Sequence, residues 1–154
     1  MAPDIARLKD LLPHECLSQL AMVRVGRVGI AAGEAPLILP VNFIVLGESV
    51  VFRTVPGTKL GAAKAGAAVS FEADEYAPDG TWGWSVLLHG IASEMAAGAE
   101  RDSIRVTLLR AWAFHEGAAD RIVRIDPTSI TGRGFGHAVQ ALGQSHCQRP
   151  HGQA

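Results

Sequence analysis

Two basic side chains and two threonines fall close together in the stretch VFRTVPGTKLGAAKAG, residues 51–66: Arg53, Thr54, Thr58 and Lys59. Arginine grips phosphate as a planar fork and lysine as a mobile point charge. Threonine hydroxyls and the backbone N–H groups at a helix start add neutral donors. A Pro-Gly turn brings a strand end and a helix start together here, so the stretch predicts a site for a terminal phosphate. The alternative is a solvated strand end with ordinary surface charges, and the glycine spacing excludes a Walker-type loop.

Two further stretches offer groups to a flat heterocycle. In LPVNF, Pro40 interrupts an apolar strand, costs that strand a ladder hydrogen bond and predicts a local edge or bulge. Asn42 places an amide donor and acceptor beside it. In GWSV, Trp84 offers a flat face and an indole N–H, and Ser85 offers a hydroxyl, just after a glycine-rich loop. The alternatives are a core strand with one surface Asn and a core tryptophan.

The elements expected around these residues are mostly strands. β-branched runs separated by short turns predict a meander of three antiparallel strands, and later runs predict three more. Glycines in the first strand, such as Gly26, mark places where something packs closely. The absence of strand–helix–strand alternation indicates a mainly β fold, a small antiparallel barrel with helices at its rim. The expected strands cover residues 23–32, 37–46, 49–54, 67–76, 84–95 and 120–133, the last bent at Pro127, and the expected helices cover 13–22, 58–66 and 99–113.

Length and composition limit the class of protein. The chain has 154 residues, of which 48% are hydrophobic and 19% charged, as in a single globular domain. A formal net charge of −1 leaves no general basic face for nucleic acid or anionic lipid. No apolar run reaches membrane-spanning length and the N-terminal stretch lacks a signal-peptide pattern, so we expect a cytoplasmic protein. We expect one domain over residues 1–136 and a flexible tail over residues 137–154.

Other candidate residues carry weaker signals. GRGFG at residues 132–136 has the glycines of a dinucleotide turn, but no further strand with an acid follows, so Arg133 is expected to close the last strand or reach the rim of a ligand site. His89 is a candidate general acid or haem ligand, against the commoner structural role. Cys16 and Cys147 are expected to be reduced thiols. No metal site and no nucleophile–base pair is predicted, so the catalytic residues are left open.

In this order along the chain, GRVG, LPVNF, FRTVPGTKL, VSFEADEY, GWSVLLHG and ITGR resemble the pyridoxamine 5'-phosphate oxidase-like family, the FMN-binding split barrels. The resemblance extends over residues 13–135. It implies a six-stranded antiparallel split barrel with short flanking helices, which forms a homodimer with two flavin sites at the subunit interface. It also implies redox chemistry on a small organic substrate, with the flavin carrying the reaction and the protein supplying binding and orientation.

Carried over residue by residue, the resemblance assigns residues to the cofactor. The residues that would hold the FMN phosphate are Arg53, Lys59, Thr54 and Thr58. Those that would lie along the flavin ring are Pro40, Val41 and Asn42. The partner subunit would contribute Trp84 and Ser85.

The same resemblance leaves the reaction open. The full pyridoxamine phosphate oxidases carry an extended C-terminal region with basic residues for the substrate phosphate, and this tail does not match it. Small relatives use FMN, a deazaflavin or haem. A deazaflavin-dependent reductase, with Lys64 and Arg27 along a basic channel, is therefore an alternative, as are a non-catalytic flavin-binding protein and a haem-binding barrel with His89 as axial ligand.

Overall fold

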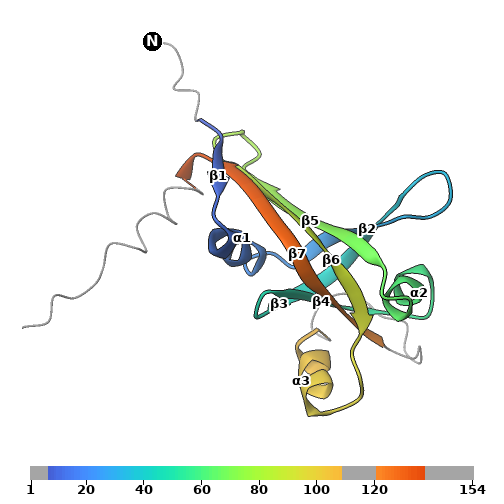
Figure 1. Cartoon of the computed structure of the whole chain (residues 1–154). Coiled ribbons are helices and arrows are strands. Elements are labelled where there is room, and N and C mark those ends of the chain that lie inside the picture. Colours follow the sequence, from blue (N-terminus) through green and yellow to red (C-terminus); the bar gives the residue numbers. More distant parts are fainter. Residues whose placement is uncertain (1–6, 109–120, 138–154) are drawn as a thin grey trace, which may run out of the picture.

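The structure is a computed structural model, and it describes residues 7–108 and 121–137 (Figure 1). The expected strands at residues 37–46 and 49–54 match two observed strands residue for residue, and six of the other expected elements agree within two residues at each end. The end of the expected helix at 99–113 and nearly all of the expected tail lie outside the described residues. In chain order the elements are β1 (Lys9–Leu11), α1 (Pro13–Leu20), β2 (Val25–Ile30), β3 (Leu37–Leu46), β4 (Ser49–Thr54), α2 (Thr58–Lys64), β5 (Ala68–Tyr76), β6 (Gly83–Glu94), α3 (Ala99–Leu108) and β7 (Arg121–Phe135).

Six strands close into an antiparallel barrel, as the sequence predicts. Their order is β7-β4-β3-β2-β5-β6, and β6 pairs back with β7 to close the ring. The predicted meander is the run β2-β3-β4. A seventh strand, β1, pairs with the end of β7 outside the barrel. β1 is not predicted from the sequence, because three residues are too few to show a period-2 pattern.

The barrel interior is filled by aromatic and branched side chains that alternate with outward-facing residues along each strand. The rings of Phe43 and Phe71 meet edge to face with centroids 4.7 Å apart, and both are buried. Gly26 makes room for them, because a Cβ at this position would overlap the Phe71 ring. The expected close packing at Gly26 is therefore confirmed.

A second, smaller cluster lies on the outer face of the barrel. Val51 of β4 and Ile122 of β7 point outward there and pack with Ile104 of α3. This cluster places α3 against the outside of the sheet near the end of β4, while α1 and α2 both pack against β6 and β7. Among the described helices, none is long and apolar enough to cross a membrane.

The strand that carries Pro40 has a free edge, as expected. β3 pairs with β2 from Leu37 to Asn42, but its ladder with β4 begins only at Phe43. The side of β3 that faces β4 is therefore unpaired at Pro40, which has no N–H to donate. The predicted bend of the last strand also appears, because the register of β6 against β7 shifts between His89 and Gly90, where Gly90 faces Pro127.

Candidate functional site

Arg53 lies on the outer face of the barrel, one residue before the end of β4. Its neighbour Phe52 points into the barrel core, so the alternation of the strand turns Arg53 outward. Across the sheet it faces Ile122 of the outer cluster, and its side chain is half-buried. A guanidinium at a partly buried strand end is well placed to bind an anion, because the apolar surroundings strengthen the interaction.

Asn42 shares this outer face with Arg53. Asn42 directly precedes Phe43, and Arg53 directly follows Phe52. These two phenylalanines form a cross-strand pair whose rings point inward, so the side chains of Asn42 and Arg53 point the other way. The Oδ1 atom of Asn42 is buried and has no hydrogen-bond partner among the described residues. A buried acceptor without a donor costs roughly 1–3 kcal/mol, a cost that a bound molecule with a suitably placed donor would remove.

The second half of the predicted phosphate clamp lies on α2, three residues beyond the end of β4. The helix begins at Thr58, which is exposed, and Lys59 is half-buried in its first turn. Burial lowers the pKa of the Lys59 ammonium below its ordinary value. No carboxylate in the described ranges forms an ion pair with Lys59. An incoming phosphate would therefore stabilise its charged ammonium form, which partial burial disfavours.

Thr54 and Val41 face the barrel interior. Thr54 is 4% exposed, and its hydroxyl donates to the carbonyl of Val55 at 3.2 Å. Val41 belongs to the barrel core, so a ligand on the outer face would meet its backbone alone. Pro40 is exposed, one alternation away from Asn42 on the same outer face. The structure thus brings Pro40, Asn42 and Arg53 to one surface.

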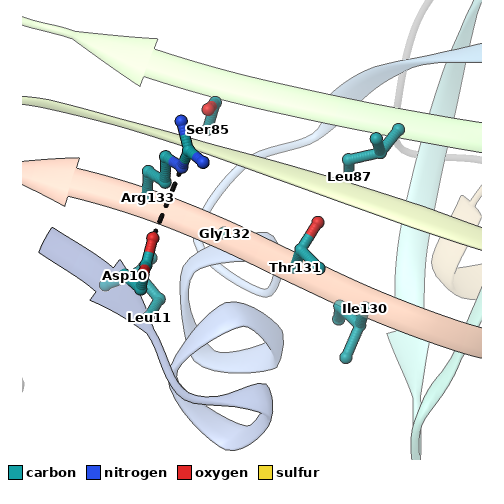
Figure 2. A pocket seen from close by; sticks show the side chains of 8 residues that line it. All are labelled: Asp10, Leu11, Ser85, Leu87, Ile130, Thr131, Gly132 and Arg133. Atoms are coloured by element: carbon teal, nitrogen blue, oxygen red, sulfur yellow. Dashed lines mark ion pairs between the residues drawn. The ribbon is translucent and has the colours of Figure 1, made fainter.

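The two residues predicted on β6 point in opposite directions. Trp84 is buried in the barrel core, and Ser85 is exposed on the outer face. Ser85 lies between Asp74 of β5 and Arg133 of β7 in the sheet register. It lines a surface hollow of about 640 Å³, where Arg133 reaches toward Asp10 of β1 (Figure 2).

Within a single chain, the residues around Arg53 and those around Ser85 do not come together. Arg53 is opposite Ile122 near the start of β7, whereas Ser85 is opposite Arg133 near its end. The rise of about 3.3 Å per residue separates these positions by roughly 35 Å of strand. The roles of Trp84 and Ser85 toward the cofactor therefore stay predictions that require a second chain.

His89 lies on the outer face of β6, at the register shift. Its Nδ1 atom is 2.9 Å from the hydroxyl of Ser70 on β5, and the two residues form a cross-strand pair. In the described part of the chain, no group of three His, Cys, Asp or Glu side chains is arranged to hold a metal ion. The Ser70–His89 contact is not predicted from the sequence, because residues 19 positions apart become neighbours only through strand pairing.

Comparison with known proteins gives the chain a family. A family model described as pyridoxamine 5'-phosphate oxidase matches residues 13–134. An uncharacterized protein of Mycobacterium tuberculosis is 34% identical over 137 residues, which cover 85% of this chain and 88% of that protein. Neither match assigns a substrate.

Solved structures share the fold. An FAD binding protein from Mycobacterium smegmatis is 32% identical in sequence, and its structure has a TM-score of 0.64 to this chain. The match covers 84% of this chain and 99% of that one. A FAD-binding protein from Mesorhizobium loti has a TM-score of 0.71 over 85% of this chain and 98% of its own, at 24% identity. The second likeness shows the split-barrel fold alone.

Proposed function

Because the chain belongs to the pyridoxamine 5'-phosphate oxidase family, we propose that it is an FMN-dependent oxidoreductase that acts on a small organic substrate. The observation that carries the proposal is the buried Oδ1 atom of Asn42, an acceptor on the same outer face as Arg53 for which the described part of the chain supplies no donor. A flavin nucleotide has the matching groups, since its ring N–H and ribityl hydroxyls donate and its phosphate is an anion. When bound, the flavin supplies the redox chemistry.

The chain's own residues bind and orient the cofactor in this proposal. Arg53 and Lys59 hold the phosphate, and the exposed hydroxyl of Thr58 adds a donor at the start of α2. The hydroxyl of Thr54 donates to the carbonyl of Val55, so Thr54 would add a donor to the phosphate only by giving up that hydrogen bond. Asn42 accepts a hydrogen bond from the flavin.

The ring side of the site needs a second subunit. Pro40 and the backbone of Val41 lie along one side of the ring, and the partner's Trp84 and the partner's Ser85 approach from the other. The support is the separation within one chain, where the Arg53 and Ser85 positions lie at opposite ends of β7. We therefore propose a homodimer, located in the cytoplasm, with two equivalent flavin sites.

FAD is the second candidate cofactor. It contains the whole of FMN, so the same clamp and the same Asn42 acceptor would serve its flavin half. The specific support is the FAD binding protein from Mycobacterium smegmatis, which is 32% identical to this chain. The adenylate half would extend beyond the phosphate clamp.

The decisive experiment is a visible absorption spectrum of the purified protein before and after incubation with FMN or FAD and desalting. Retained flavin bands at one flavin per chain, on a protein that elutes as a dimer, support the proposal. A colourless protein that releases both flavins argues against it and directs the search to a deazaflavin, and a Soret band would point to haem. Turnover with a reductant and an acceptor then separates an oxidoreductase from a flavin-binding protein without activity.

A further inference from the structure

Ser70 of β5 and His89 of β6 form a hydrogen-bonded pair outside the residues assigned to the flavin. The two residues are direct cross-strand neighbours on the outer face of the barrel, and the Ser70 hydroxyl oxygen lies 2.9 Å from the His89 Nδ1 atom. When the ring proton is on Nε2, the Nδ1 atom accepts the hydroxyl proton. A serine and a histidine at this distance have the geometry of a nucleophile and its general base.

The strand irregularity at His89 holds the histidine in place. The register of β6 against β7 shifts between His89 and Gly90, and the hydroxyl of Thr128 donates to the His89 carbonyl at 3.1 Å. Irregularities of this kind are over-represented next to active sites, where they re-aim a side chain. The backbone of His89 is thus held from β7, while its ring is held by Ser70 from β5.

A hollow of about 430 Å³ lies beside the pair. Ser70 and His89 both line it, together with the apolar side chains of Pro36 and Ile38. Gly29 is the cross-strand neighbour of Ser70 on β2, and because it has no side chain, it leaves Ser70 open on that side. The hollow therefore gives a small molecule access to the serine hydroxyl.

The lining of the hollow favours an uncharged ligand. No Asp, Glu, Lys or Arg is among the described residues that line it. The next outward residue after Ser70 on β5 is Glu72, whose carboxylate is already held by Arg27 at 3.0 Å. A charged group would lose its hydration here without gaining a partner of opposite charge. None of the residues assigned to the flavin lines this hollow.

We propose that Ser70 is a nucleophile that takes up an acyl group from an uncharged ester, with His89 as its general base. This activity does not rest on the proposed function. The Ser70 Oγ atom attacks the ester carbonyl carbon, and its proton passes to the Nδ1 atom of His89. The bond from that carbon to the leaving oxygen breaks, the leaving group departs with the proton, and the acyl group stays on Ser70.

Hydrolysis of the acyl group returns the protein to its starting state. A water molecule attacks the carbonyl carbon of the acyl group while its proton passes to His89. The bond to the Ser70 Oγ atom then breaks, the serine takes the proton back from His89, and the carboxylic acid leaves. Both steps use the same two side chains, so removal of either side chain should affect acylation and turnover together.

p-Nitrophenyl butyrate is a suitable probe, because it is uncharged and its leaving group departs readily and is visible. Its reaction is followed by absorbance and by intact mass for the wild type, Ser70→Ala, His89→Ala and the control Ser129→Ala. Ser129 is an exposed serine opposite His89 on β7 that does not line the hollow. The wild type should gain a butyryl group at Ser70, located by peptide mapping. Ser70→Ala should lose this adduct, His89→Ala should form it roughly 100-fold or more slowly, and the control should react like the wild type.

Two further measurements keep the test independent of a variant's folding, which circular dichroism reports. Phenylmethylsulfonyl fluoride should label Ser70 of the unchanged protein, and imidazole added to His89→Ala should restore part of the acylation rate. The proposal is wrong if butyryl groups are spread over lysines at the same rate in all variants, if the adduct is on His89, or if imidazole has no effect. Added FMN should leave the acylation of Ser70 unchanged, and protection of Ser70 by FMN would instead assign the hollow to the flavin site.

Discussion

The phosphate clamp can be tested by comparing two ligands that differ only in the phosphate. FMN and riboflavin share the ring and the ribityl chain, so removal of a phosphate-binding side chain should weaken FMN alone. We expect Arg53→Ala and Lys59→Ala each to raise the Kd for FMN about 10- to 100-fold. The reason is that a hydrogen bond to a charged group contributes about 1.5–3 kcal/mol, and each 1.4 kcal/mol changes an equilibrium constant tenfold. The Kd for riboflavin should change little.

The pH dependence of flavin binding provides a second test of the phosphate clamp. Burial lowers the pKa of Lys59, so this side chain loses its charge at a lower pH than an ordinary lysine. The preference of the wild type for FMN over riboflavin should therefore decline as the pH rises through that lowered pKa, and should decline less in Lys59→Ala. Flavin fluorescence titrations at several pH values measure both constants.

Lys64→Ala is the matched control, since Lys64 lies on the last turn of the same helix and is exposed. It should leave both Kd values unchanged. Equal weakening of FMN and riboflavin by Arg53→Ala would refute the phosphate role, and so would an effect of Lys64→Ala as large as that of Lys59→Ala. Asn42→Ala should behave differently and weaken both ligands by a similar factor, because its acceptor is assigned to the shared part of the molecule.

Three stability measurements test the fold around the site. Ser49→Ala should lower the free energy of unfolding in urea at pH 7 by about 1–2 kcal/mol, because the Ser49 hydroxyl donates to Asp126 at 2.6 Å and lowers the pKa of that carboxyl. This stabilisation is present above the pKa of Asp126 in the unfolded chain and is lost as the pH falls through the lowered pKa of the folded protein. The stabilities of the variant and the wild type should therefore converge in acid. Gly26→Ala should cost about 1–3 kcal/mol, since its Cβ overlaps the Phe71 ring, and an unchanged denaturation midpoint would contradict that packing. Lys59→Met should raise the Tm of the flavin-free protein while it weakens FMN, because the partly buried ammonium is a cost without a ligand; a lower Tm would argue against this reading.

The strands of the meander follow from local sequence alone. The runs LILPVNFIVL and SVVFRT are rich in β-branched residues and are ended by glycine-containing turns, so their bounds are set by neighbours along the chain. The free edge at Pro40 follows equally directly, because proline has no N–H wherever the strand lies. The cluster of Arg53 and Lys59, proposed as a phosphate clamp, was visible in the sequence for a similar reason, since the two residues are only six positions apart.

Strand pairing decided what the sequence could not show. The three residues of β1 form a strand only because the end of β7 offers them an edge. Trp84 and Ser85 are adjacent in sequence, yet the two-residue period of the strand turns them to opposite faces. The Trp84 ring is buried in the barrel, and the Ser85 hydroxyl is exposed beside Arg133. The sequence by itself determined most of the elements and the closeness of Arg53 to Lys59, and the tertiary structure decided which side chains share a face, because that depends on strand order and register.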